Sequence, residues 1–331
     1  MPHGEAATAE SFRSARVRRF LVAALVFAAL ALSPLAIRSV YLQNVLVLTL
    51  LYAAVSQSWN ILGGYCGQIS LGHGLYFGIG AYATSVLFVT WGILPWGGMI
   101  VGGVLAVAVA LLIGYPCFRL QGHYFAIATL VIAQSGLVLM QNWDFVGAAR
   151  GIQWPFGPDS WWTLQFARAK TPYIEVSLAL LVASWLATVL IGESRWGYWW
   201  RAVKDDALAA ESLGVEVFRS KMAAAGVSAF FTAVGGGVYA AFLAYIDPDA
   251  VMSFRFSLLF ALPAVLGGIG TPWGPLVGAA VLVPLGEFSR SYLGGSGSGL
   301  DLVIYGALVM AVALARPQGL LSLVPRRRAA P

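Results

Sequence analysis

The feature that most constrains this chain is a stretch of 80 residues, from Ser39 to Phe118, without a single Asp, Glu, Lys or Arg. Over all 331 residues only 10% are charged and 59% are apolar or aromatic, whereas a soluble domain has about 25% charged residues. A membrane-spanning helix needs about 20 mostly apolar residues, so the uncharged stretch has room for three spans and their turns. The chain is therefore predicted to be an all-α bundle that crosses a lipid bilayer many times.

About ten spanning segments, including broken or re-entrant helices, are expected at residues 20–37, 41–61, 75–92, 99–118, 124–142, 173–192, 222–246, 257–270, 273–290 and 300–316. The first resembles a signal peptide, but its apolar run is longer than a usual signal core, so an uncleaved anchor is favoured. The expected organisation is a tail at residues 1–19, a membrane domain at residues 20–316 with an inner loop at residues 193–221, and a tail at residues 317–331.

The positions of Lys and Arg predict the orientation. Placing both termini in the cytoplasm puts fourteen of the twenty on the inner side. The six left outside are Arg38, Arg150, Arg168, Lys170, Arg255 and Arg290. Since Lys and Arg are generally retained on the cytoplasmic side of a membrane, the fourteen-to-six split favours both termini inside. The same flanking positions explain the net charge of +6 without nucleic-acid binding.

No motif for catalysis, metal binding or nucleotide binding is visible in the sequence. There is no Gly-x-x-x-x-Gly-Lys-Ser/Thr phosphate loop. Cys66 and Cys117 lack the spacing of a zinc site or disulfide framework and are interpreted as buried free thiols. His73 and His123 have no carboxylate partner nearby in sequence and are interpreted as hydrogen-bonded residues at helix ends. We expect no enzyme activity, no metal and no cofactor, which leaves transport.

A glycine-rich segment at residues 62–74 reads Leu-Gly-Gly-Tyr-Cys-Gly-Gln-Ile-Ser-Leu-Gly-His-Gly, with five glycines between two apolar spans. Glycine costs about 1 kcal/mol relative to Ala inside a helix, so the segment is predicted to unwind where it lines a watery cavity or turns inside protein. Unwound carbonyls and the N-terminus of the next helix could hold the two charges of a solute. The candidate pathway residues here are Tyr65, Gly67, Gln68, Ser70, Gly72 and His73. The alternative is that the glycines only let helices cross closely.

A second interrupted segment, Leu-Gly-Gly-Ile-Gly-Thr-Pro-Trp-Gly-Pro at residues 266–275, starts 204 residues later. Paired interruptions in two halves of a chain are typical of transporters. Only the Leu-Gly-Gly start is identical, so the sequence indicates a similar role and no proven duplication. Gly268 is the candidate pathway residue in this segment.

The inner loop contains Arg-Ala-Val-Lys-Asp-Asp-Ala-Leu-Ala-Ala-Glu-Ser-Leu-Gly at residues 201–214. Either Asp205 or Asp206 can cap the N-terminus of a surface helix of two to three turns, and Gly214 can close it in the left-handed conformation. Its contact face is expected to include Ala210 and Glu211, and to suit a partner's groove. The alternative is an amphipathic helix resting on lipid headgroups, which the acidic residues disfavour.

Five motifs resemble branched-chain amino acid ABC transporter permeases in the same order. They lie at residues 64–82, 122–130, 202–215, 267–278 and 316–320, and the resemblance covers residues 42–321. Gly-Gln-Ile-Ser-Leu-Gly-His and the closing Arg-Pro-Gln-Gly-Leu are closer to the LivM-type subunit than to the LivH-type subunit. One departure is residues 146–159, where many relatives have a Thr/Gly/Asn- or Asp-rich stretch. Related systems move urea, short amides or aromatic acids, so the implied substrates are branched-chain amino acids or related small polar solutes.

The resemblance implies a subunit of the bacterial cytoplasmic (inner) membrane that works in a larger complex. The implied partners are a LivH-type permease, two ATP-binding subunits and an extracytoplasmic solute-binding protein. The coupling helix that docks on the ATPase would contain Asp205, Asp206, Ala209, Ala210, Glu211 and Gly214. ATP would be bound by the partner subunits, in agreement with the missing phosphate loop.

The alternative from another class is a stand-alone, ion-coupled secondary transporter or channel. Such carriers commonly hold ionisable residues within their spans. The 80-residue stretch has none, and Glu175 and Glu287 lie near predicted segment ends. A membrane enzyme is a more distant alternative.

The predicted orientation can be checked with reporter fusions. A fusion at Trp161 is expected to report the outer side of the membrane, and a fusion at Ala207 the inner side, because the inner loop holds five of the fourteen positive charges assigned to the inner side. Paired alkaline phosphatase and green fluorescent protein fusions at both positions measure this. An outer signal at Ala207 would reverse the topology.

Overall fold

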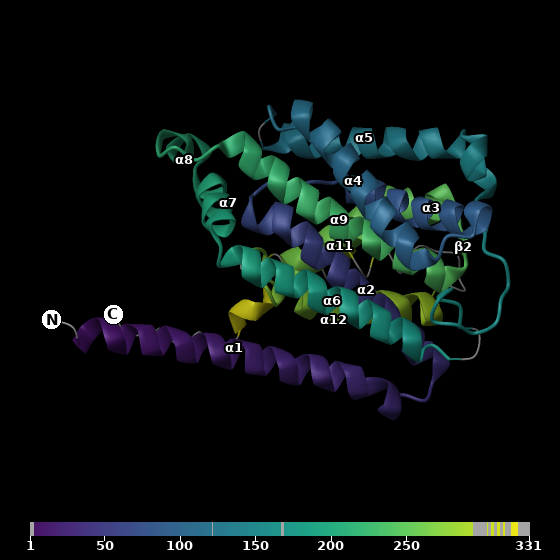
Figure 1. Ribbon diagram of the computed structural model, residues 1–331, viewed down its shortest axis with the longest axis horizontal. Coiled ribbons are helices and arrows are strands. Elements are labelled where there is room, and N and C mark those ends of the chain that lie inside the picture. Colours follow the sequence, from purple (N-terminus) through teal and green to yellow (C-terminus); the bar gives the residue numbers. More distant parts are fainter. Residues whose placement is uncertain are drawn as a thin grey trace.

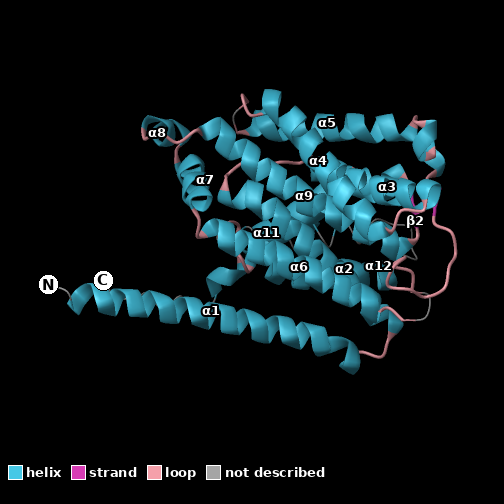
Figure 2. Cartoon of the chain, viewed as in Figure 1, coloured by secondary structure: helices cyan, strands magenta, loops and turns pink. Residues whose placement is uncertain are grey.

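The computed structural model describes residues 3–120, 122–166 and 169–293, positions 303, 306, 307, 310, 311 and 314, and residues 319–323. Most of these residues lie in long helices that run roughly alongside one another, with the loops at the two ends of the bundle (Figures 1 and 2). The predicted all-α, polytopic fold is confirmed. Cys66 and Cys117 are buried free thiols, as expected.

The long helices are α1 (His3–Ala36), α2 (Val40–Asn60), α3 (His73–Trp91), α4 (Pro95–Cys117), α5 (His123–Gln141), α6 (Thr171–Gly192), α9 (Val217–Leu243), α11 (Phe254–Gly268) and α12 (Gly274–Leu293). Shorter helices are α7 (Arg195–Asp205), α8 (Ala207–Ser212) and α10 (Pro248–Met252). A π-helical turn, η1 (Ile61–Tyr65), follows α2, and single 3₁₀ turns occur at η2 (Asp144–Val146), η3 (Ala148–Arg150) and η5 (Leu320–Leu323). Strands β1 (Ile152–Gln153) and β2 (Tyr245–Ile246) pair antiparallel.

Eight helical stretches among the described residues are long and apolar enough to cross a membrane: Val17–Ala36, Val40–Tyr65, His73–Trp91, Pro95–Cys117, His123–Gln141, Thr171–Gly192, Val217–Leu243 and Pro248–Gly268. They coincide with the first eight predicted segments. The ninth predicted segment is α12, which has Glu287 and Arg290 in its last turns. The tenth, at residues 300–316, and the C-terminal tail lie largely outside the described residues.

Two boundaries differ from those expected. Helix α9 begins at Val217, so residues 217–221 belong to a helix and the inner loop is shorter than predicted. The eighth span is broken at Ser253 into α10 and α11, and Asp247 caps α10 by accepting a hydrogen bond from the Ala250 N–H at 2.8 Å. The start of α9 was placed too late in the sequence because a hydropathy profile ends a span at a charged residue such as Lys221.

Helix α2 forms the centre of the bundle. In its most apolar window 89% of the residues are buried, and it packs against α6, α9, α11 and α12. An aromatic cluster fills the space beside it: the Phe77 ring centroid lies 4.9 Å from that of Phe260 and 5.6 Å from that of Phe256. A bundle whose central helix is buried on all sides leaves few positions where a solute can pass.

The two ends of the bundle differ in character. Helices α7 and α8 lie at one end, with the start of α1, and β2 lies at the other (Figure 1). An ion pair of 3.0 Å between Arg19 Nη1 and Glu193 Oε1 joins α1 to the end of α6. We call the end with α7 and α8 the loop end, and the end with β1 and β2 the hairpin end.

Glycines set how closely α3 and α9 approach. A Cβ atom on Gly236 would collide with the Phe77 carbonyl, and one on Gly80 with the backbone of Ala233. These contacts are between backbones, so no side chain can move aside to make room. Close approach of small residues is the usual way membrane helices gain packing energy.

We expect Gly236→Ala to lower the free energy of unfolding by about 1–3 kcal/mol, because the added methyl group forces the two helices apart. Gly226→Ala on the same helix is the matched control, since its Cβ would lie 3.6 Å from Val107 Cγ1, an ordinary contact. Thermal unfolding of the purified chain in detergent, followed by tryptophan fluorescence, measures both. Equal unfolding temperatures for the two variants would contradict this account of the α3–α9 contact.

Candidate functional site

The glycine-rich segment is irregular, as predicted. After α2 the helix widens into the π turn η1, in which the Cys66 N–H donates to the Ile61 carbonyl at 3.3 Å. Residues 66–72 then form no helix, and α3 begins at His73. Gly67 has a φ angle of +73°, which favours glycine. π turns inside α-helices occur frequently at functional sites.

Most of the candidate pathway residues in this segment are buried. Tyr65, Ser70, Gly72 and His73 are buried, while Gly67 and Gln68 are partly exposed. The Trp59 Nε1–H donates to the Ser70 carbonyl at 2.8 Å. The side chains around the segment therefore satisfy backbone groups that the broken helix leaves without partners.

His73 belongs to a buried polar network between three helices. Its Nε2 lies 2.8 Å from the Ser228 hydroxyl, which itself donates to the Ser58 carbonyl at 2.6 Å. Because the hydroxyl proton of Ser228 is used on Ser58, His73 Nε2 carries a proton and donates it to Ser228. This agrees with the interpretation of His73 as a hydrogen-bonded residue at a helix end.

The glycines of this segment allow close contacts with three other elements. A Cβ on Gly64 would lie 2.6 Å from the Gly270 nitrogen, one on Gly67 would lie 2.9 Å from Lys204 Cγ, and one on Gly72 would lie 2.8 Å from the Thr129 carbonyl oxygen. These distances leave no room for a methyl group. Within the described part of the chain the contacts favour the close-packing interpretation, and the role of the segment as a pathway stays a prediction.

The structure brings the two interrupted segments together. The Gly270 N–H donates to Asn60 Oδ1 at 2.8 Å, and Asn60 Nδ2 donates to the Thr271 carbonyl at 2.9 Å. Gly268, the candidate residue of the second segment, ends α11 with a φ angle of +134°. The amide side chain of Asn60, at the end of α2, therefore pairs with one backbone N–H and one backbone carbonyl of a turn that lies more than 200 residues away in the sequence.

Lys204 of α7 connects the inner loop to both segments. Its Nζ donates to the Gly64 carbonyl at 2.8 Å, and a Cβ on Gly270 would lie 3.2 Å from the same nitrogen. The sequence analysis missed both Lys204 and Asn60. Asn60 could have been found as a polar residue at the end of a span directly before the glycines, but the partner of Lys204 lies 140 residues away.

The inner-loop helix has the predicted caps. Asp206 is the N-cap: its Oδ1 accepts from the N–H groups of Leu208 at 2.9 Å and Ala209 at 3.0 Å. Asp205 instead ends α7. Gly214 has a φ angle of +85°, the left-handed conformation expected of it. With six residues, α8 is shorter than the two to three turns predicted.

One candidate coupling residue is placed differently from the prediction. Ala210 is 2% exposed and packs with Trp200 and Val203, so its side chain does not belong to an outward contact face. The exposed apolar residues of this region are Leu208, at 73%, and Leu213, at 85%. Both side chains are therefore available to a partner.

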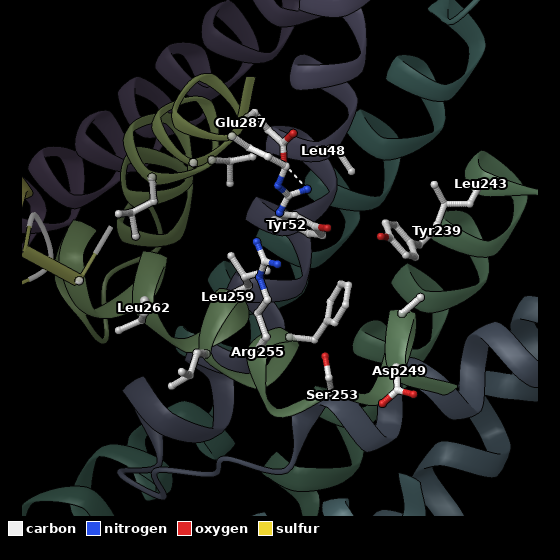
Figure 3. A pocket seen from close by; sticks show the side chains of 18 of the residues that line it. Leu48, Tyr52, Tyr239, Leu243, Asp249, Ser253, Arg255, Leu259, Leu262 and Glu287 are labelled. Atoms are coloured by element: carbon white, nitrogen blue, oxygen red, sulfur yellow. Dashed lines mark ion pairs between the residues drawn. The ribbon is translucent and has the colours of Figure 1, made fainter. Parts of the chain in front are cut away.

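A cavity of about 720 Å³ lies elsewhere, near the hairpin end, between α2, α9, α10, α11 and α12, and Gly306 and Met310 also line it (Figure 3). Its wall is mostly apolar and aromatic, and charged residues line it too. The charged lining residues are Asp249, Arg255, Glu287 and Arg290. None of the seven candidate pathway residues from the sequence analysis lines this cavity. Sequence reasoning missed it because its residues come from five helices and from positions 306 and 310, without a shared motif.

A multi-pass helical bundle with two interrupted segments in contact, an exposed capped helix at one end and a mixed polar and apolar cavity toward the other defines a membrane transport protein. Residues 41–313 match the family described as branched-chain amino acid transport system / permease component. The chain belongs to this family. It is a multi-pass protein of the inner membrane.

Individual relatives agree with the family. The chain is 27% identical over 302 residues to the high-affinity branched-chain amino acid transport system permease protein LivM of Escherichia coli K12, covering 84% of this chain and 69% of the relative. The LivM protein of Salmonella typhimurium LT2 is 26% identical over the same shares. The permease protein LivH of Escherichia coli K12 is 25% identical over 284 residues, covering 82% of this chain and 91% of the relative. No solved structure matches the chain. The resemblance to LivM-type permeases is confirmed, and these relatives are transport permeases and not enzymes.

We expect Asn60→Leu to loosen the contact between the two interrupted segments. Leucine keeps the volume but leaves the partly buried Gly270 N–H and Thr271 carbonyl unpaired, and an unpaired group costs up to about 1–3 kcal/mol when it is buried. Hydrogen exchange at residues 266–275, followed by mass spectrometry, should accelerate at least about tenfold. Asn142→Leu is the control, because that amide donates only to the Val138 carbonyl at the exposed end of α5. Unchanged protection of residues 266–275 in Asn60→Leu would refute the bridging role.

Proposed function

We propose that this chain is the permease subunit of an ABC importer that moves branched-chain amino acids or related small polar solutes. The observation that carries this proposal is the connection from the exposed helix α8 through Lys204 to the two interrupted segments. A helix that projects from the bundle and is joined to its irregular interior suits the transmission of force from an external motor. The family match supports the solute class.

The importer would contain four further components. They are a LivH-type permease that pairs with this chain, two ATP-binding subunits at the loop end, and a solute-binding protein at the opposite, extracytoplasmic end. Similarity to both LivM and LivH relatives supports the permease pair. ATP would be bound and hydrolysed by the partner subunits, and both termini of this chain would lie in the cytoplasm. This chain would use no cofactor of its own and would bind no nucleic acid.

The mechanism follows from the contacts at the loop end. The ATP-binding subunits would grip α8 through Leu208, Leu213 and Glu211, and their closure would displace α7. Lys204 would transfer this displacement to the Gly64 carbonyl and to the turn at Gly270. Because residues 67–72 lie outside the helices, they can change conformation at lower cost than a regular span. We propose that this segment, with Tyr65, Gln68, Ser70 and His73, forms the inner part of the path.

Reconstitution tests the proposal. The chain is placed in liposomes with its companion permease, the ATP-binding subunits and the solute-binding protein. Solute uptake and stimulation of ATP hydrolysis by the liganded binding protein are expected. Uptake by this chain alone would instead support a stand-alone carrier, and neither activity in the full assembly would refute the importer proposal.

Within that assembly we expect Lys204→Met to reduce uptake about tenfold or more, because a charge-assisted hydrogen bond contributes about 1.5–3 kcal/mol to the state in which it forms. Basal ATP hydrolysis should persist, and stimulation by the binding protein should fall. Arg219→Met is the matched control: it removes a positive charge from the same region, where Arg219 pairs only with the exposed Glu216 at 2.8 Å. Equal uptake by the two variants would remove Lys204 from the mechanism.

A further inference from the structure

The cavity near the hairpin end combines an aromatic wall with two guanidinium groups. Tyr52, Tyr239 and Phe256 line it and are each less than 10% exposed. The side chain of Arg255 extends toward Tyr52, and Glu287 lies on the far side of the same space (Figure 3). A volume of about 720 Å³ is within the range of about 300–1,000 Å³ typical of small-molecule sites.

The charges in the cavity are only partly satisfied by one another. Arg290 Nη1 lies 3.7 Å from Glu287 Oε1, longer than a hydrogen bond, so this ion pair leaves donors on Arg290 available. Asp249 accepts a hydrogen bond from Gln141 Nε2 at 3.0 Å. Within the described part of the chain Arg255 has no ion pair. Arg255 is exposed and the Arg290 side chain is 51% exposed, so both guanidinium groups are open to a solute that reaches the cavity.

We propose that this cavity binds a solute that has a carboxylate and a compact apolar body. The carboxylate is held by Arg255 and Arg290, and the apolar body packs on Tyr52, Tyr239 and Phe256. Guanidinium groups can bind a carboxylate through two parallel hydrogen bonds, which fixes its orientation as well as its charge. A solute that also has an ammonium group places it near Glu287.

The competing occupant is the phosphate of an anionic lipid, which is negatively charged like the carboxylate of the proposed solute. Glu287 disfavours it, because a lipid phosphate beside Arg290 would also lie beside the Glu287 carboxylate and offers no positive group to pair with it. A zwitterionic solute matches both signs. The charge pattern therefore favours a solute with an apolar side chain.

This inference deepens the proposed function by assigning the solute a binding site in this chain, and it rests on that function only for the direction of transport. Binding itself needs no ATP and no partner. The proposed site lies toward the hairpin end, away from Lys204. At a helical rise of 1.5 Å per residue, Tyr52 in the cavity is about 18 Å along the chain axis from Gly64.

Direct binding to the full chain in phosphatidylcholine nanodiscs tests the inference. The probes are L-leucine, 4-methylpentanoate, which lacks the ammonium group, and isopentylamine, which lacks the carboxylate. Calorimetric titration should show binding of L-leucine at millimolar concentrations or below. Binding of 4-methylpentanoate should be weaker, because it offers no positive group to Glu287, and isopentylamine should not bind. Arg255→Gln should weaken binding of both carboxylates by at least about tenfold, the loss expected for one charge-assisted contact.

Arg150→Gln is the matched control, because Arg150 is an exposed residue at the same end that does not line the cavity. It should leave binding unchanged, and Arg255→Lys should give an intermediate affinity. Unfolding temperatures of all variants exclude a general loss of structure. Absence of binding by both carboxylates, equal binding of isopentylamine, or no effect of Arg255→Gln would overturn the proposal.

A lipid site has its own signature. If phosphatidylglycerol in the nanodiscs abolishes L-leucine binding, and Arg255→Gln releases that lipid in native mass spectrometry, the cavity is a lipid site and the inference is wrong. Import by the reconstituted wild-type assembly is measured separately. Import without carboxylate binding refutes only the cavity, and carboxylate binding without import refutes only the proposed function.

Discussion

The structure depends on one constraint: a backbone group released inside a membrane must find its partner in the protein, because lipid offers none. The chain breaks its helices at two places near the loop end, and side chains from elsewhere take up the exposed groups. Trp59 pairs with the backbone of Ser70, Asn60 with Gly270 and Thr271, and Lys204 with Gly64. The contacts that stabilise the two breaks also connect them to each other and to α7. A displacement of one of these elements therefore displaces the others.

The interactions divide the molecule into two functional ends. At the loop end, a short capped helix projects from the bundle and Lys204 leads from it to irregular backbone. Toward the hairpin end, charged and aromatic side chains from five helices surround a cavity. Helix α2 contributes to both, with Tyr52 in the cavity and Asn60 at the break. A single buried helix thus links the region where a solute would be selected to the region where the driving force would arrive.

Much of the fold could be predicted from the sequence because hydropathy and glycine content are local signals. The uncharged stretch predicted its spans, and the glycine run predicted the irregular backbone at residues 62–74. The caps Asp206 and Gly214 were also local. What could not be predicted depends on distant contacts. These are the burial of Ala210 in a cluster with Trp200, the partner of Lys204, and the cavity, whose residues become neighbours only when α2, α9, α10, α11 and α12 assemble. The start of α9 was misplaced because a buried lysine, Lys221, reads as a loop residue in a hydropathy profile.

Helix α1 stands apart from this arrangement. Only 6% of its spanning window is buried, and its contacts with the rest of the chain are concentrated where Ala23, Phe20 and Phe27 meet Trp185 and Trp273. Most of the side chains at residues 17–36 are exposed or partly exposed, and lipid acyl chains at such positions would accept one aliphatic side chain as readily as another. Substitutions of one apolar residue for another in α1 should therefore have little effect, except at the residues that contact Trp185 and Trp273. The sequence of this helix is free to differ among related permeases while the adjacent bundle stays the same.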